Sequence, residues 1–575
     1  MMGVFHILKV AALAACAIAA PVEERKSGKG PKSFLTEVGN STWVLGNEIW
    51  NVTQGRQYAN KLWYKGKDRV GQAVGHYVSY NGAASDLNWT SAAIFDSGSS
   101  WINVKFTAKE GDFHWVIHDD LAGAYQYFVN HALPRLGEFR TLWRLDNTSF
   151  PNGHTDVKDG VLPPVEEYAT ATNVQDETWQ TADGTFLTKY DWSSFIRTQT
   201  FYGVYGDEVG SWYINPGKDY YNGNHLKEEL MIHRESKTGD AVQLNMIHGT
   251  HYLASASDDF ADGKTWGPWL WYLNDGSKDD ASQRWEEEDK SWPYEWFNDT
   301  GYQSRGSISG RFVLSDGRPA SGAAVFLGDS NSNISTADQG RDYYYTVYAD
   351  NGGNFKIDNV RAGTYGLYAW SNGGSIADVA TSFVKNDVVI IQNEENSIKT
   401  LNWTVTDTKS RIFQIGSFDH VTDGFALSGP TPFEHARISK CPANLTYTIG
   451  ASNTSDWCFG QSALGTWSIN FNLSSIPSSA AGAKLTASLA GFSGGSSANI
   501  LLNEVKVGNI TTNSALLVSS QDTYRGATRA GEWRLLEFPV AGGLLKEGNN
   551  RVDIKVTSST QWRGWLWDSI VLEWV

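Results

Sequence analysis

The feature that most constrains the fold is a set of short runs in which apolar and polar residues alternate. The runs "WINVKFTA", "YTVYAD" and "RVDIKVTS" are examples, and turns rich in Gly, Asn and Asp separate them. Successive side chains of a strand point to opposite faces, so this period predicts strands with one buried face. Helical periodicity is scarce. The sequence therefore predicts an all-β protein.

Changes in residue composition and in the pattern of strands and turns divide the 575 residues into units. Residues 20–300 have the highest density of Trp, Tyr and His, and we expect any chemistry there. Residues 301–405 contain the strand–turn–strand pattern "GSISGRFVLSDGRPASGAAVFL", which predicts a small β-sandwich that serves as a spacer. Residues 406–575 are rich in Ser, Gly and Asn, and their evenly spaced strands and turns predict a jelly roll.

The first residues, "MMGVFHILKVAALAACAIAAPVEERK", predict a secretory signal peptide over residues 1–19. An apolar run from Val10 to Ala20 contains an Ala-Ile-Ala cleavage pattern that ends at Ala19. The run is too short to span a bilayer, and no later apolar run reaches 18 residues, so no membrane association is expected. We expect a secreted, extracellular protein.

Two further features fit an extracellular location. Removal of the signal peptide would take Cys16 with it, and a disulfide is the natural pairing of the remaining Cys441 and Cys458. A catalytic cysteine is thereby excluded. Eleven Asn-x-Ser/Thr sequons predict a glycoprotein, at Asn40, Asn51, Asn88, Asn147, Asn298, Asn333, Asn402, Asn444, Asn453, Asn472 and Asn509.

Charge and aromatic content narrow the class of partner. A net charge of −16 argues against nucleic acid, and it means that local basic residues must attract any anionic substrate. The 25 Trp, 25 Tyr and 25 Phe fit large sheet faces or stacking platforms for sugar rings. Near the C-terminus, Trp562, Trp565 and Trp567 are candidates for such a platform. Trp565 and Trp567 share one strand face, which favours a place in the core.

Basic residues in the first unit are the more informative candidates. "LGEFRTLWRLD" places Arg140 and Arg144 four residues apart, which on a strand puts them on one face about 13 Å apart. Such a pair suits successive carboxylates of an extended polymer, because guanidinium binds carboxylate in a planar, bidentate manner. Spacing alone favours the alternative, in which both are surface residues paired with Glu138 or Asp146.

The stretch "DGTFLTKYDWSSFIR" reads as a strand with Lys189 at its centre. Asp191 would then lie on the same face and raise the pKa of Lys189, which opposes a role as a base. Lys189 can act as a base only if Asp191 is engaged elsewhere. It also needs apolar or cationic neighbours that lower its pKa.

Histidines cluster in "NGNHLKEELMIHRESKTGDAVQLNMIHGTHY", at His225, His233, His248 and His251, without the spacing of a compact metal motif. Paired carboxylates for glycoside hydrolysis have only weak candidates, such as "HDD" at residues 118–120. Arginines, a lysine and histidines on a β-scaffold permit β-elimination on a polyuronate. That reaction needs the uronate charge offset and a base for the C5 proton.

Five motifs, in this order, resemble the rhamnogalacturonan lyases of polysaccharide lyase family 4: "LGEFRTLWRLD", "GTFLTKYDW", "NHLKEELMIH", "GSISGRFVLSDGRPASGAAVFL" and "RIFQIGSFDHVTDGF". The resemblance covers nearly the whole mature chain. It implies a catalytic β-sandwich at 20–300, a fibronectin-III-like domain at 301–405 and a jelly roll resembling a carbohydrate-binding module at 406–575. It also implies cleavage of the rhamnose–galacturonate bond of rhamnogalacturonan I, which leaves a 4,5-unsaturated galacturonate.

The resemblance implies roles for four residues. Lys189 would be the C5 base, and Arg140 and Arg144 would bind the substrate. His233 would protonate the leaving oxygen or orient the site. The segment between lysine and histidine is shorter than in the better-known fungal members, and no tyrosine shortly precedes His233. The alignment could therefore slip, and His248 in "MIHGTHY" stays open as an alternative.

The resemblance leaves the following expectations for cofactors and partners. No cofactor is required, since the arginine pair makes Ca²⁺ unnecessary for catalysis. Acidic loops such as "DDFADGKTW" could hold a Ca²⁺ against the uronate, and a structural Ca²⁺ in the C-terminal domain stays open; no metal ligand is assigned. We expect a monomer that acts on rhamnogalacturonan I. The alternative from a different class is a pectin-binding protein without catalytic activity.

Overall fold

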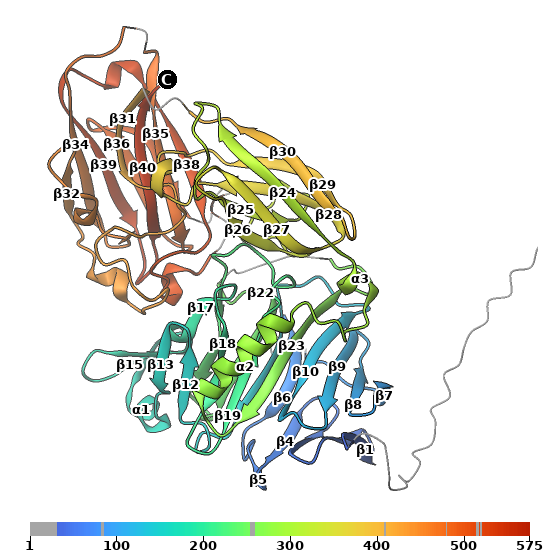
Figure 1. The fold of residues 1–575 in the computed structure, drawn as a ribbon. Coiled ribbons are helices and arrows are strands. Elements are labelled where there is room, and N and C mark those ends of the chain that lie inside the picture. The colour runs from blue at the N-terminus through green and yellow to red at the C-terminus, as the bar shows by residue number, and fades with distance from the viewer. Residues whose placement is uncertain are drawn as a thin grey trace, which may run out of the picture.

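The computed structural model describes residues 32–81, 86–252, 259–406, 410–478, 480–512, 514, 517 and 520–575. The predicted signal peptide lies outside these residues. The chain forms three β-domains, here domains I, II and III, and the all-β prediction is confirmed. Domain II, in yellow, and domain III, in orange to red, lie together on one side of domain I (Figure 1). No helix in the described ranges is long and apolar enough to cross a membrane.

Domain I is a sandwich of two nine-stranded antiparallel sheets. The first, here sheet A, runs in the order β1 (Phe34–Gly39), β2 (Thr42–Gly46), β3 (Trp50–Gln54), β4 (Ala59–Tyr64), β6 (Gly75–Tyr80), β11 (Glu138–Leu145), β22 (Ala241–Gly249) and β21 (Ile232–Arg234), with β5 (Lys67–Asp68) beside β4. The second, sheet B, runs in the order β13 (Lys158–Val161), β12 (Asn152–Thr155), β18 (Phe201–Tyr205), β19 (Gly210–Ile214), β23 (Thr265–Asn274), β10 (Gly123–Asn130), β9 (Gly111–His118), β8 (Trp101–Thr107) and β7 (Ser91–Ser97).

Tryptophan fills the space between these sheets. Six fully buried indoles belong to this core, namely Trp50, Trp115, Trp143, Trp266, Trp269 and Trp271. The aromatic richness of the sequence therefore builds the core of domain I first of all.

Other elements cover the outer faces of the sandwich. Helix α2 (Lys278–Ser291) packs on sheet B, and Ser277 caps its N-terminus by accepting a hydrogen bond from the Asp280 amide. Beside sheet A lie two small sheets, β14 (Thr172–Gln175)–β15 (Thr178–Gln180)–β16 (Phe186–Thr188) and β17 (Ser193–Phe195)–β20 (Glu228–Leu230). Short helices α1 (Val165–Thr170) and α3 (Thr300–Gln303) complete the domain.

Domains II and III are smaller sandwiches. Domain II has two sheets. One is three-stranded, in the order β27 (Asn354–Arg361), β24 (Arg305–Leu314) and β30 (Glu395–Trp403), and the other is four-stranded, in the order β26 (Tyr345–Tyr348), β25 (Ala324–Gly328), β28 (Gly363–Trp370) and β29 (Phe383–Ile390). Domain III pairs β31 (Arg411–Gly416), β40 (Trp565–Trp574), β35 (Gly482–Phe492), β38 (Arg534–Ala541) and β33 (Gly460–Gln461) against β32 (Leu445–Thr448), β34 (Gly465–Leu473), β39 (Gly548–Ser558), β36 (Ser497–Leu502) and β37 (Val505–Thr511).

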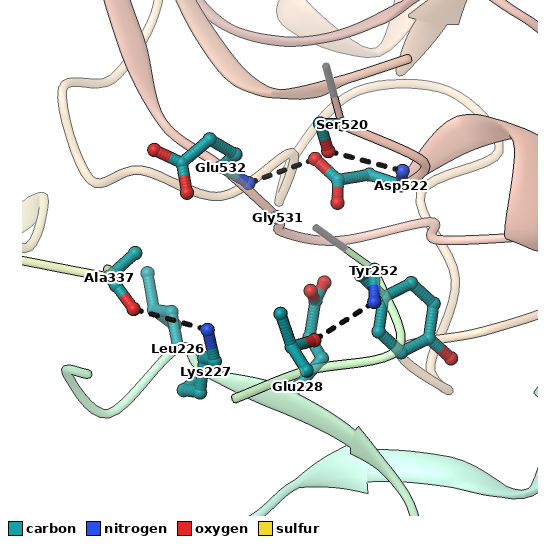
Figure 2. A pocket seen from close by; sticks show the side chains of 10 residues that line it. Leu226, Lys227, Glu228, Tyr252, Ala337, Ser520, Asp522, Gly531 and Glu532 are labelled. Atoms are coloured by element: carbon teal, nitrogen blue, oxygen red, sulfur yellow. Dashed lines mark hydrogen bonds between the residues drawn. The ribbon is translucent and has the colours of Figure 1, made fainter. Parts of the chain in front are cut away.

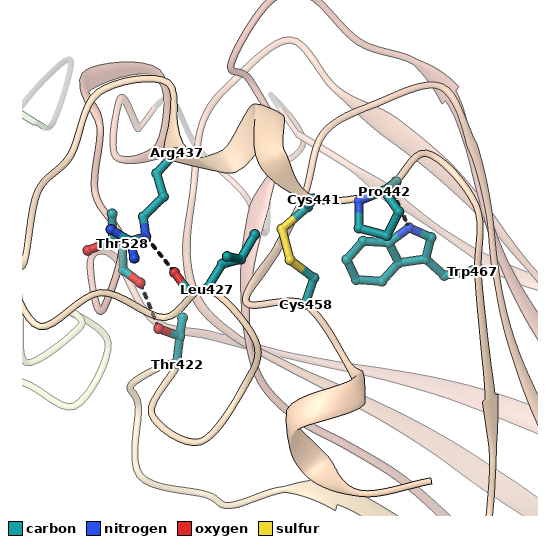
Figure 3. The surroundings of a disulfide bond; sticks show 8 residues. All are labelled: Thr422, Leu427, Arg437, Cys441, Pro442, Cys458, Trp467 and Thr528. Carbon is teal, nitrogen blue, oxygen red and sulfur yellow. Dashed lines mark hydrogen bonds between the residues drawn. A yellow bond between two sulfur atoms is a disulfide. The ribbon is translucent and has the colours of Figure 1, made fainter.

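Domain III settles two predictions. Cys441 and Cys458 form the expected disulfide, with Cα atoms 5.9 Å apart (Figure 3). Trp565 and Trp567 are fully buried, which confirms their place in the core. Trp562 is only 3% exposed and packs edge-on against His435, so the three tryptophans form no sugar platform.

Buried charges join domain II to domain I. Asp219 of domain I accepts hydrogen bonds from Arg305 and Arg361 at 3.0 and 2.9 Å, and all three side chains are buried. Nearby, Lys264 donates to three consecutive backbone carbonyls, those of residues 340–342. Domain II is therefore bound to domain I through these charges and does not merely space the other two.

The three domains meet around a small internal cavity of about 20 Å³, enough for one water (Figure 2). Glu228 enters it from domain I, and Asp522 and Glu532 enter it from domain III. Lys227 donates to the Ala337 carbonyl of domain II. Burial raises the pKa of Asp522 to about 6 and the pKa of Glu228 well above its usual range. The junction therefore favours protonated carboxyl groups.

We expect Asp219→Asn to destabilise the protein by about 3–5 kcal/mol, because two buried guanidinium groups lose their counter-charge. Chemical denaturation monitored by tryptophan fluorescence measures this loss. Asp423→Asn is the control: Asp423 pairs with Arg529 at 2.6 Å on the surface, and its removal should cost about 0–1 kcal/mol. Equal losses in the two variants would contradict the structural role of Asp219.

The junction also predicts an unusual dependence of stability on pH. A carboxyl group whose pKa is raised by folding binds its proton more tightly in the folded state. The stability it contributes is complete below the pKa of the unfolded chain, about 4, and is lost as the pH rises through the folded value. We expect the melting temperature to fall from pH 4 through pH 6 and above. Glu228→Gln should flatten this decline; an unchanged slope would show that Glu228 does not contribute.

Candidate active site

The outer face of sheet A presents two arginines in a row. Arg140 and Arg144 lie four residues apart on β11, and Leu142 lies midway between them on the same face. All three are half-buried or buried and point away from the tryptophan core, in which Phe139 and Trp143 lie. Since residues i and i+4 of a strand share a face, this arrangement follows from the spacing of the sequence. The prediction that both arginines share a sheet face is confirmed.

An apolar patch lies between and beside the arginines. Its buried members come from β6, β11, β20 and β22, and they are Tyr77, Leu142, Leu230, Val242, Leu244 and Met246. This patch keeps water from the stems of the arginines, which strengthens the field of their charged ends.

Both arginines hold polar partners. Arg140 Nε donates to Ser79 Oγ at 3.0 Å, and its Nη1 lies 3.4 Å from Glu138. Arg144 Nε donates to Asp240 Oδ2 at 2.6 Å, and its Nη2 lies 3.5 Å from Glu235. Pairing with Glu138 or Asp146 is the alternative to substrate binding that the sequence offers. Arg140 does pair with Glu138, whereas Arg144 pairs with Asp240 and Glu235 and not with Asp146.

The segment around Lys189 differs from the predicted strand. Residues Lys189–Trp192 form a 3₁₀-helix, η2, inserted between β16 and β17. Three residues per turn replace the two-residue alternation of a strand, so Lys189 and Asp191 leave the backbone in different directions. Asp191 is half-buried and accepts a hydrogen bond from the backbone N–H of His435 at 2.9 Å. The prediction of a strand through Lys189 was wrong. The requirement that Asp191 be engaged elsewhere is met by the His435 N–H.

The surroundings of Lys189 lower its pKa. Burial is the main cause, Asp176 opposes it from 3.9 Å, and the guanidinium of Arg525 adds to it. Arg525 comes from domain III, lies 3.4 Å from Asp176, and stacks over the Tyr190 ring. A buried lysine near a cation is held closer to its neutral form, which is the form that can accept a proton.

His233 lies on the same side of the molecule as Lys189. On β21 it faces Val242, which in turn faces Arg144 on β11, so His233 and Arg144 occupy one row across sheet A. Helix η2 packs against β21, which brings Lys189 next to this row. Burial lowers the pKa of His233 to about 3, and the charges of Lys189 and both arginines add to the shift.

A second histidine, His251, belongs to the same group of residues. Its Nε2 lies 3.3 Å from Arg140 Nη1 and its Nδ1 lies 4.0 Å from Glu229. Burial lowers its pKa well below the usual value, assisted by Arg140 and Lys189. The sequence pointed to His251 only as one member of a histidine cluster, three positions after His248 in "HGTH".

The other two histidines of the cluster, His248 and His225, pack against aromatic rings away from this group of residues. His248 is fully buried, faces Phe139 across the strand pair and packs edge-on against Phe260. His225 stacks on Trp370 of domain II at 5.8 Å. The structure thus separates His233 and His251 from His248.

Domain III forms one wall of the site, which the sequence did not indicate. Besides Arg525 and His435, the Tyr524 carbonyl accepts a hydrogen bond from Gln175, and the Tyr252 carbonyl accepts one from the Gln521 N–H at 2.7 Å. Tyr190 and Tyr252 of domain I belong to the same apolar cluster as the core of domain III. Lys189 is therefore withdrawn from water by residues more than 240 positions later in the sequence.

No group of three or more His, Cys, Asp or Glu side chains in the described part of the chain could hold a metal ion. The site as described offers cations and histidines for an anionic ligand: Lys189, Arg140, Arg144, Arg525, His233 and His251. It can bind a carboxylate and accept a proton beside it.

Comparisons with known proteins agree with this picture. Residues 315–398 match the family described as polysaccharide lyase family 4, domain II, and residues 411–572 match polysaccharide lyase family 4, domain III. A rhamnogalacturonate lyase of Dickeya dadantii is 29% identical over 77% of this chain and 76% of its own length.

Two fungal relatives are more distant. A probable rhamnogalacturonate lyase B of Aspergillus niger is 25% identical over 66% of this chain and 62% of its own length. A rhamnogalacturonate lyase B of Emericella nidulans is 25% identical over 64% of both chains. This chain thus spans less than two thirds of these fungal proteins. Domains II and III of polysaccharide lyase family 4 are thus matched in order, behind a sandwich that carries the expected basic residues, and the chain is similar to members of that family.

Proposed function

We propose that this protein is a secreted rhamnogalacturonan lyase that cleaves the rhamnose-(1→4)-galacturonate bond of rhamnogalacturonan I by β-elimination. The observation that carries the proposal is the buried Lys189, with its lowered pKa, beside the Arg140–Arg144 row. The names of the three relatives support the substrate class. The product would carry a 4,5-unsaturated galacturonate at its new non-reducing end.

The chemistry divides among the residues of the site. Successive uronate carboxylates of the polymer would bind at Arg140 and Arg144, exchanging with Glu138 and Asp240, which now pair with them. Guanidinium groups would stabilise the charge that develops on the carboxylate as C5 loses its proton. Neutral Lys189 Nζ would take that proton, and the electron pair would form the C4–C5 double bond as the C4–O4 bond breaks. The departing O4 then requires a proton.

The two histidines suit different parts of this last step. His251 Nε2 faces an N–H of Arg140, so Nε2 carries the lone pair and Nδ1 the hydrogen. His251 therefore positions Arg140. His233, in the row of Arg144, is the better candidate to assist the leaving oxygen. Burial holds it neutral, so it would donate an imidazole N–H, directly or through a water.

Secretion and glycosylation are supported by surface features. All eleven sequon asparagines are exposed or half-buried, which leaves them accessible to modification. The Cys441–Cys458 disulfide suits an oxidising compartment. We propose a monomeric extracellular enzyme whose reaction needs no cofactor. A structural Ca²⁺ is still to be tested.

Lys189→Ala should strongly slow elimination, because it removes the amine that takes the C5 proton. The measurement is the ultraviolet absorbance of unsaturated uronates released from de-acetylated rhamnogalacturonan I, with the melting temperature as the check of folding. We expect a loss of about 10²–10⁴-fold, the range that general-base catalysis contributes. The wild-type rate should survive a chelator.

The same assay separates the competing readings. New reducing ends without ultraviolet absorbance would indicate a hydrolase. Saturable binding without new chain ends, unaffected by Lys189→Ala, would establish a pectin-binding protein without activity.

Arg525→Met tests the role of domain III at the site. Loss of this cation should raise the pKa of Lys189, so the lyase would need a higher pH to become active. We expect the acid limb of the kcat/KM profile to move to higher pH. Arg529→Met is the matched control, since Arg529 pairs with Asp423 on the surface of the same domain. A profile that falls in height but does not move would show that Arg525 only binds substrate.

A further inference from the structure

A groove of about 490 Å³ lies between domains II and III, lined by none of the candidate catalytic residues. Domain II contributes the loop 332–336, Trp370 and Ser382, and domain III contributes His420 and Trp533. Its size falls in the range of small-molecule sites.

Trp533 is distinctive among the tryptophans of domain III. Of seven in that domain, five are buried in the core, namely Trp457, Trp467, Trp562, Trp565 and Trp567. Trp533 and Trp574 keep part of their surface exposed, and of these two Trp533 lines the groove. An indole left partly in water at the wall of a groove is the usual platform for an amphipathic ring.

The Trp533 ring is held in place by a stack of rings through all three domains. His420 stacks on Trp533 at 4.0 Å and 18°, Trp370 stacks on His420 at 5.4 Å and 4°, and His225 stacks on Trp370 at 5.8 Å and 12°. His420 has a positive φ of 65°, an uncommon conformation, and its N–H donates to Asp568 at 2.8 Å. Trp533 Nε1 donates to Ser488 Oγ at 2.9 Å. The platform is therefore preorganised.

The polar groups of the groove are neutral. Ser332, Asn333, Ser335, Thr336 and Ser382 bring hydroxyl and amide groups to it, and no carboxylate lines it. The one charged lining residue, Arg534, is ion-paired with Glu532 and lies 3.8 Å from Asp338. Hydroxyl and amide groups beside an aromatic ring recognise the two sides of a neutral sugar, its hydroxyl groups and its C–H face.

We propose that this groove binds a short run of neutral sugars, supplied by the neutral side chains of the polysaccharide on which the candidate active site acts. The choice of this source rests on the proposed function. The groove would anchor a side chain while the acidic backbone occupies the Arg140–Arg144 row of domain I. The uncharged lining argues against the acidic backbone itself as the occupant.

The test is calorimetric titration of Asn333→Gln protein with neutral β-1,4-galacto- and α-1,5-arabino-tetrasaccharides. These ligands contain no uronate, so binding is measured independently of lyase activity. We expect one site that Trp533→Ala weakens at least tenfold and that Trp574→Ala leaves unchanged. Ser382→Trp, which fills the groove from an exposed position, should also weaken binding, and it guards against misfolding of Trp533→Ala.

Three outcomes would overturn the proposal. One is no binding of either ligand. Another is binding that neither Trp533→Ala nor Ser382→Trp changes. The third is binding by Asn333→Gln but not by the glycosylated wild type, which would assign the groove to the glycan of Asn333 on its rim. Failure of the lyase assay with intact tetrasaccharide binding would instead overturn the proposed function and leave the groove as a neutral-sugar site.

Discussion

The burial of Lys189 beneath domain III is the constraint on which the site depends. A lysine on the rim of domain I alone would be solvated and charged, and it could not accept a proton near neutral pH. Domain III excludes water from it, supplies the Arg525 guanidinium, and holds Asp191 away through the His435 N–H. Asp176 moderates the effect from 3.9 Å. The low pKa is thus a property of the assembled chain.

Because the pKa of Lys189 depends on the position of domain III, the ion pairs and ring stacks that hold the three domains together matter for the site. Asp219 with its two arginines fixes domain II on domain I, and the ring stack from His225 to Trp533 continues through domain II into domain III. If domain III moved away, Lys189 would regain water and charge. The interfaces therefore maintain the buried surroundings of Lys189.

The charges on sheet A also explain how a protein of negative net charge could bind the anionic substrate proposed for it. The protein carries a charge of −16, yet the site gathers Arg140, Arg144, Lys189 and Arg525. Carboxylates such as Asp240 and Glu138 balance the arginines while the site is empty. In the proposed reaction an arriving uronate would replace one carboxylate by another, which would reduce the cost of removing the guanidinium groups from water.

The sequence by itself determined the all-β class, the Arg140–Arg144 row and the Cys441–Cys458 pairing, because these follow from local periodicity or from the few residues available. It also suggested Lys189 as a base, through resemblance. Only the tertiary structure decided the 3₁₀ turn that separates Lys189 from Asp191, the presence of His251 beside Arg140, and the wall that domain III provides. Those features join residues tens to hundreds of positions apart, and no local pattern records which distant side chains will share a buried environment.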